Sequence, residues 1–194
     1  MPSERTVEDR VLDAARACVE AFGVRRTTLA DVARRAGVSR PTVYRHWPDA
    51  GALVADLLTR ELRALLDGAA PDPGTGTARD RLARRTADGV TALLGHPLFT
   101  RVVDTEPELL ATYAFHRLGA VQRAALDAIR PEIAAGQVDG SVRPGDPDAL
   151  ARMVLVAAQA AATSRRLTED VLPGPALAAE LRHLVAAYLA PAGA

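Results

Sequence analysis

The sequence contains no lysine, a single cysteine and few aromatic residues, and each shortage narrows the class of protein. All 24 basic residues are arginine. Cys18 has no second cysteine to pair with, which fits a reducing cytoplasm. Aromatic residues make up 4% of the chain while alanine is abundant, and this favours helix–helix packing over a sheet. No stretch reaches the roughly 18 uninterrupted apolar residues of a membrane span, and the charged N-terminus lacks a secretion signal. We therefore expect a cytoplasmic, all-α protein without a membrane partner.

The charge is balanced overall but unevenly distributed. The formal net charge is zero. Within residues 22–47, six arginines face one acid, Asp31, which gives +5 there and leaves −5 for the rest of the chain. The six are Arg25, Arg26, Arg34, Arg35, Arg40 and Arg45. A basic segment in a neutral chain can attract phosphate, so the distribution favours a nucleic-acid partner.

Residues 28–47 have the pattern of two short helices joined by a tight turn. Thr28 can cap the first helix, with Asp31 in the place of the capping-box glutamate. Apolar residues then recur every three or four positions, which predicts one buried face. Gly37 ends this helix, because glycine enters the left-handed conformation at little cost.

The second helix of the pair begins after Ser39, which can cap it. Pro41 falls in the first turn, where its missing N–H is harmless, and Val43 is predicted to be a core residue. This spacing is typical of a helix-turn-helix, although an ordinary helical hairpin remains an alternative.

The rest of the chain is predicted to be helical, with loops at 68–77 and 136–147. Val7 and Phe22 bound an expected buried stripe on the first helix, and Pro131 is expected to kink or end a helix. The other predicted helices cover 7–22, 49–67, 78–94, 97–105, 107–130, 148–167 and 174–190.

The last two predicted helices have more apolar surface than a single neighbour would cover. Residues 149–164 are apolar around most of the helix, and 174–190 carry a leucine-rich stripe. Two such helices from each of two chains would form a four-helix interface. The alternative is that both helices belong to the core of a monomer.

The segment AGVSRPTVYRHW (36–47), preceded by two helices and followed by an amphipathic one, resembles the TetR family of transcriptional regulators. The resemblance covers roughly residues 7–58 and rests on Gly37, Val38, Ser39, Thr42, Tyr44, His46 and Trp47. It implies an all-α homodimer with a DNA-binding domain at 1–48 and a helical regulatory and dimerisation domain at 49–194, in which 49–67 form a connecting helix. It also implies a repressor that binds a pseudo-palindromic operator in double-stranded DNA and is released by a small-molecule inducer.

The second helix of the motif supplies most of the candidate DNA contacts. Arg40 is the candidate base reader, because a guanidinium can bind guanine O6 and N7 together. Thr42 could contact a base or a phosphate, and Pro41 a thymine methyl group. Family resemblance assigns Tyr44 and His46 to phosphates, although Tyr44 could instead pack and His46 could cap the helix. The full candidate set is Thr28, Ser39, Arg40, Pro41, Thr42, Tyr44, Arg45 and His46.

Two positions depart from the family pattern. Members often have a lysine near the start of the fourth helix, where this chain reads Pro48-Asp49-Ala50-Gly51. Some have a basic base-reading residue early in the second helix, where Ala30 stands here. Base recognition is therefore expected to depend more on Arg40 and on the shape of the operator.

A ligand pocket is expected among the helices of 78–167, lined by apolar groups and a few polar ones. The candidates are Phe99, Val103, Tyr113, His116, Met153 and Gln159. For each of them, an ordinary core or surface role is the more common alternative. The dispersed histidines and the lack of any catalytic motif predict no enzyme, cofactor or metal. The alternative function is a helical DNA-organising or ligand-binding protein without inducer-controlled transcription.

Overall fold

The computed structural model describes residues 6–68, 75–109 and 118–192, and these residues form helices and turns with no strand. The chain divides into two compact units. Unit 1 comprises residues 1–61 and 97–115, and unit 2 comprises residues 62–96 and 116–194. The predicted all-α fold is confirmed.

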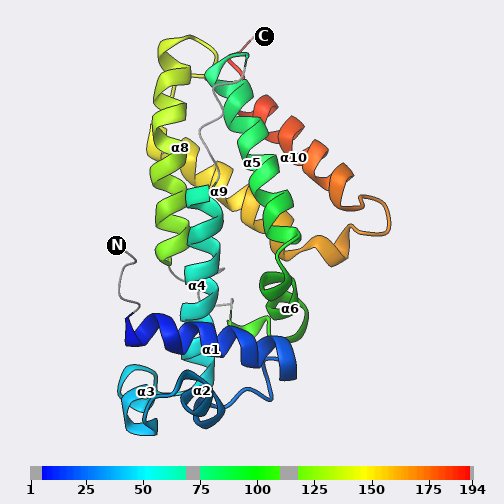
Figure 1. Ribbon diagram of the computed structural model, residues 1–194. Helices are drawn as coiled ribbons and strands as arrows, with labels where there is room; N and C mark the ends of the chain where they lie inside the picture. The colour runs from blue at the N-terminus through cyan, green and yellow to red at the C-terminus, as the bar shows by residue number, and fades with distance from the viewer. Residues whose placement is uncertain (1–5, 69–74, 110–117, 193–194) are drawn as a thin grey trace. The chain divides into compact units, whose positions relative to one another are not determined.

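Unit 1 contains the N-terminal helices and one helix from the middle of the chain. Its helices are α1 (Val7–Phe22), α2 (Leu29–Ala36), α3 (Arg40–His46), most of α4 (Ala50–Gly68) and α6 (Pro97–Thr105). In Figure 1, α2 and α3 lie side by side with α1 across them. The core of this unit is formed by small and branched side chains, among them Val11, Ala15, Val32, Val43, Leu53, Leu57 and Val102.

Helix α1 has the predicted bounds and begins with a capping box formed by Thr6 and Asp9. The prediction that Val7 and Phe22 are buried is wrong, because they are 41% and 47% exposed. They are the first and last residues of the helix, and neighbouring elements cover the apolar stripe only along its middle.

Unit 2 is a bundle of long helices. It contains the end of α4, then α5 (Ala78–Leu94), α8 (Ala120–Val138), α9 (Pro147–Thr163), the short 3₁₀ helix η1 (Arg165–Leu167) and α10 (Gly174–Leu189). Helix α5 contacts α8, α9 and α10, and α9 also contacts α8 and α10 (Figure 1). Leu62 and Leu65 of α4 are only partly covered.

Helix α8 runs past Pro131 to Val138, so of the two predicted outcomes, a kink or an end, the end is wrong, and so is the predicted loop start at 136. A proline removes only one backbone donor from a helix. The turn beyond it carries Ile133 and Gly136, both buried, so continuing the helix adds to the core. At Gly136 the packing is close, since an added Cβ would lie 2.3 Å from Cγ2 of Val142.

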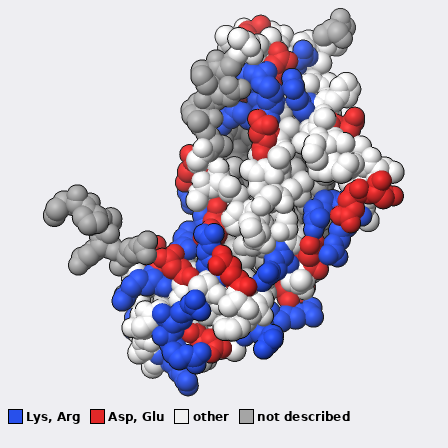
Figure 2. Space-filling view, turned by 45° about the vertical axis from the view of Figure 1, so that its right-hand side comes forward, with Lys and Arg blue, Asp and Glu red and all other residues white. Residues whose placement is uncertain are grey.

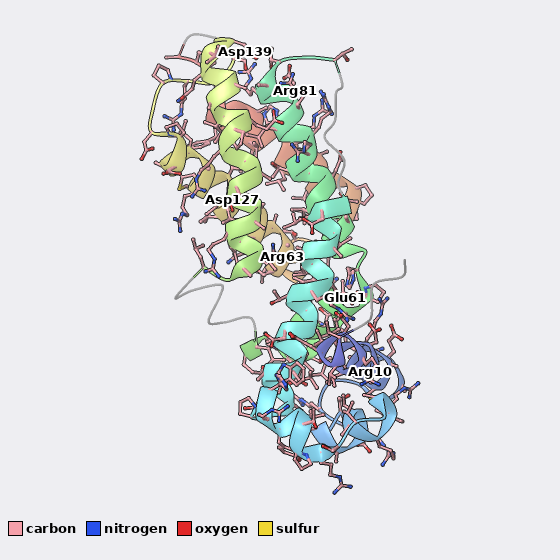
Figure 3. The ribbon with its side chains drawn as sticks, turned by 60° about the vertical axis from the view of Figure 1, so that its left-hand side comes forward. Arg10, Glu61, Arg63, Arg81, Asp127 and Asp139 are labelled. Atoms are coloured by element: carbon pink, nitrogen blue, oxygen red, sulfur yellow. The ribbon has the colours of Figure 1, made fainter. Side chains whose placement is uncertain are left out.

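The turn after α8 is tied to the start of α5 by Asp139, which Figure 3 labels with Arg81. The Asp139 carboxylate accepts hydrogen bonds from the N–H groups of Ala78 (3.1 Å) and Ser141 (2.9 Å). Hydrogen bonds from Ser141 and then Ala78 hold the pKa of Asp139 below its usual value. None of the helices in the described ranges is long and apolar enough to span a membrane.

Candidate nucleic-acid interface

The turn between α2 and α3 has the geometry that the sequence predicts. Gly37 adopts φ +65° and ψ +34°, in the left-handed region. The Val38 N–H then donates to the Ala33 carbonyl at 3.1 Å. Nothing lies within 4 Å of a Cβ built at Gly37, so glycine is needed here for its backbone conformation and not for space.

Thr28 caps α2, but Asp31 acts differently from a capping-box residue. The Asp31 N–H donates to Thr28 Oγ1 at 3.1 Å, and the Thr28 hydroxyl donates to the Asp31 carboxylate at 2.6 Å. The same carboxylate pairs with Arg34 at 2.7 Å. The Thr28 hydroxyl first, and Arg34 second, hold the pKa of Asp31 below its usual value. Asp31 therefore neutralises the charge of Arg34 and accepts the hydrogen bond that the Thr28 hydroxyl donates.

Helix α3 is capped by Ser39, whose Oγ accepts from the Thr42 N–H at 3.3 Å and lies 2.7 Å from the Thr42 hydroxyl. Val43 and Trp47 turn inward and are 0% and 3% exposed. The opposite face is open to solvent, and its exposed residues are Arg40, Pro41, Tyr44, Arg45 and His46. The sequence candidates on α3 therefore share one accessible surface, with Thr42 partly covered.

Trp47 fixes the end of α3 against α4. Its indole Nε1 donates to Oδ2 of Asp56 at 2.8 Å, and its ring centroid lies 5.5 Å from that of His46. The sequence identified Trp47 as a motif residue only. Nothing in the spacing of a solvent-exposed aspartate on the next helix indicated this contact.

The six arginines of residues 22–47 are not equivalent. Arg25 pairs with Glu106 and Arg34 pairs with Asp31. The other four are exposed and make no hydrogen bond or ion pair with the residues that the structure describes: Arg26, Arg35, Arg40 and Arg45. Figure 2 shows arginines gathered over the N-terminal helices at the lower end of the view. These four side chains are available to an anionic partner.

Helix α1 is joined to α4 by ion pairs that the sequence analysis missed. Arg16 pairs with Glu61 at 3.0 Å, and Arg60 pairs with Asp13 at 2.9 Å. Glu61 is labelled in Figure 3. The partners lie 45 or more residues apart, so no local pattern could predict them. Partly exposed pairs of this kind contribute modestly, about 0–1 kcal/mol each.

The predicted ligand residues fall in both units. Phe99 is buried and Val103 partly covered, both on α6 in unit 1. On α9 in unit 2, Met153 is 50% exposed and Gln159 is partly covered. The Gln159 Oε1 accepts from Gln122 Nε2 of α8 at 3.4 Å. Tyr113 and His116 lie outside the described residues. In the parts of the chain that the structure describes, no group of three or more histidine, cysteine or acidic side chains could hold a metal.

Comparison with known proteins agrees with this geometry. Residues 11–57 match the family described as bacterial regulatory proteins, tetR family. An uncharacterised HTH-type transcriptional regulator of Mycobacterium bovis is 40% identical over 180 residues, which cover 93% of each chain. FadR of Bacillus subtilis, solved with stearoyl-CoA, superposes with a TM-score of 0.65 at 17% identity, covering 91% of this chain and 96% of FadR. RolR, solved with resorcinol, gives 0.69 at 14% identity, covering 92% and 86%. The chain belongs to the TetR family of bacterial regulatory proteins.

Proposed function

We propose that this regulator is a repressor that binds a pseudo-palindromic operator as a homodimer and leaves it when a small-molecule inducer binds. In this proposal residues 1–48 bind DNA, and residues 49–194 bind the inducer and dimerise. The protein acts in the cytoplasm, where the operator is.

The observation that carries the DNA half is the outer face of α3. Arg40 is exposed and makes no ion pair within the described ranges, while Val43 and Trp47 hold the helix from behind. The N-terminal turn of a recognition helix lies against base edges in the major groove. Arg40 therefore reads a guanine, and Tyr44, Arg45 and His46 contact phosphates. Thr28 is the phosphate contact at the start of α2. To donate to a phosphate, its hydroxyl must first break the hydrogen bond that it makes with Asp31.

The outer faces of α9 and α10 support the dimer. Met153 and Val156 on α9 are 50% and 51% exposed, and Leu184 on α10 is 52% exposed. Exposed large apolar side chains on two helices that pack together are typical of an interface. Met153 is therefore assigned to the dimer surface. Sedimentation at micromolar concentration is expected to give a dimer, and a stable monomer would refute this assignment.

The inducer half is supported by the bundle of unit 2 and by its relatives. Gln122 of α8 and Gln159 of α9 place two partly covered amides next to each other. A few polar groups in an apolar setting are what orient a small ligand. FadR and RolR, which share the fold, were solved with stearoyl-CoA and resorcinol. Gln159 is the ligand contact that we propose first.

The DNA half is tested by anisotropy titration of a labelled duplex that covers the region upstream of the protein's own gene. Binding should be stronger than to a shuffled duplex and should weaken as salt rises. Arg40→Ala should cost about 1–3 kcal/mol and relax the preference at one base pair. A uniform loss on both duplexes would make Arg40 a phosphate contact instead.

The alternative is a helical DNA-organising or ligand-binding protein without inducer-controlled transcription. It predicts equal affinity for the upstream and shuffled duplexes, and no small molecule that releases the protein. Sequence-selective binding therefore decides between the two functions.

A further inference from the structure

Two adjacent arginines in the connector between α1 and α2 have opposite environments. Arg25 and Arg26 are both exposed, and both belong to the basic segment of the chain. Of the two, Arg25 alone makes a hydrogen bond or ion pair with the residues that the structure describes. Arg25 therefore holds the connector in place, whereas the Arg26 side chain is available to DNA.

Arg25 is held by the end of α6. Its Nε donates to Oε1 of Glu106 at 2.7 Å, and its Nη2 donates to the carbonyl of Thr105 at 3.2 Å. The Glu106 side chain is only 9% exposed, so it is a nearly buried carboxylate whose charge Arg25 balances. A buried carboxylate without its partner is costly, which keeps Arg25 in this place.

The connector itself is closely determined. Gly23 has φ +83°, and Thr27 is buried. The Thr27 hydroxyl donates to the Gly23 carbonyl at 2.8 Å, and its N–H donates to the Val24 carbonyl at 3.1 Å. Because the residues on both sides are held, the backbone of Arg26 has a defined position. Arg26 lies two residues before Thr28, the N-cap of α2.

We propose that Arg26 is a phosphate contact of the DNA interface, and that Glu106 is a positioning residue that keeps Arg25 away from the DNA and holds the connector in place. Arg26 has no ion pair within the described ranges, so its guanidinium can pair with a phosphate without breaking an existing ion pair. The proposal rests on the DNA binding argued above and adds residues to that interface.

The test is the salt dependence of duplex binding, measured for the upstream and shuffled duplexes. Each phosphate contact contributes about 0.9 to the slope of log affinity against log salt concentration. Arg26→Ala should lower the slope by about 0.9 for each protomer bound. Because a phosphate contact carries no base information, the affinity should fall by the same factor on both duplexes.

Arg25→Ala and Arg63→Ala are the matched controls. Arg63, exposed on α4 and labelled in Figure 3, should leave both affinity and slope unchanged. Arg25→Ala should weaken binding by one factor at every salt concentration and leave the slope at the wild-type value, because Arg25 acts through the connector. The double variant Arg25→Ala/Glu106→Gln removes the nearly buried carboxylate together with its partner, and it keeps this measurement possible if the single variant does not fold.

An unchanged slope in Arg26→Ala would overturn the proposal. A slope lowered equally in Arg25→Ala and its double variant would also overturn it, since Arg25 would then contact phosphate itself. Wild-type protein without salt-sensitive binding would instead refute the proposed DNA-binding function.

Discussion

Replacing Trp47 by phenylalanine should loosen the end of the recognition helix more than the small change in ring size suggests. The substitution keeps an aromatic ring in a position that is 3% exposed. It removes the indole N–H, which donates to Asp56 at 2.8 Å. Helix α3 is only seven residues long, so this contact near its C-terminus is a large part of what holds it.

The magnitude follows from two contributions. A hydrogen bond to a charged group contributes about 1.5–3 kcal/mol, and the exposure of Asp56 places this one near 1.5 kcal/mol. The smaller ring removes apolar burial and leaves a small cavity, which costs about 1–2 kcal/mol. Trp47→Phe should therefore lose about 3 kcal/mol of unfolding free energy, and Asp56→Ala about 1.5 kcal/mol. For a chain of this length, about 3 kcal/mol corresponds to a melting temperature lower by roughly 6–12 °C.

A double-mutant cycle isolates the hydrogen bond. Trp47→Phe, Asp56→Ala and the double variant are compared by urea unfolding at one protein concentration, since dimerisation makes stability depend on concentration. Circular dichroism is the probe, because Trp47 is the chain's one tryptophan and its fluorescence is lost in two of the variants. A coupling energy near 1.5 kcal/mol is expected. Strictly additive effects would refute the reasoning, because the two side chains would then contribute independently.

Further predictions concern unit 2. Gly136→Ala should destabilise by about 1–3 kcal/mol in thermal unfolding, because its Cβ would lie 2.3 Å from Val142 Cγ2. Gly89→Ala in α5, where nothing lies within 4 Å, should instead stabilise by about 0.5–1 kcal/mol, and equal effects at both sites would contradict the packing argument. Asp139→Asn should be less stable than wild type at neutral pH, because hydrogen bonds from the Ser141 side chain first, and then from the N–H groups of Ala78 and Ser141, lower the pKa of Asp139 and favour its charged form. The stabilisation from the charged carboxylate is fully present above the pKa of an ordinary aspartate, about 4, and is lost as pH falls through the lower pKa of the folded state. The unfolding free energies of the two proteins should therefore converge in acid. A difference that stays constant with pH would contradict the prediction.

Local patterns were sufficient for the helix-turn-helix. Thr28, Gly37 and Ser39 act within a few residues of their own positions, and capping and backbone conformation depend mainly on such neighbours. The same reasoning failed at Pro131, where a local rule predicted a break and the buried Ile133 beyond it favoured continuation. It also failed at the ends of α1, because periodicity indicates which face is apolar but not how far a neighbour covers it.

The sequence by itself determined the class of fold, the two helices of the DNA-binding motif and the face of α3 that meets solvent, because these depend on spacing and caps. Only the tertiary structure decided which arginines are available. Arg25 is neutralised by Glu106, 81 residues away, while Arg26 beside it has no ion pair in the described part of the chain. Charge availability depends on which side chains meet in space, and a separation of that length leaves no trace in local sequence. The same holds for Trp47 and Asp56, whose hydrogen bond exists only once the end of α3 lies beside α4.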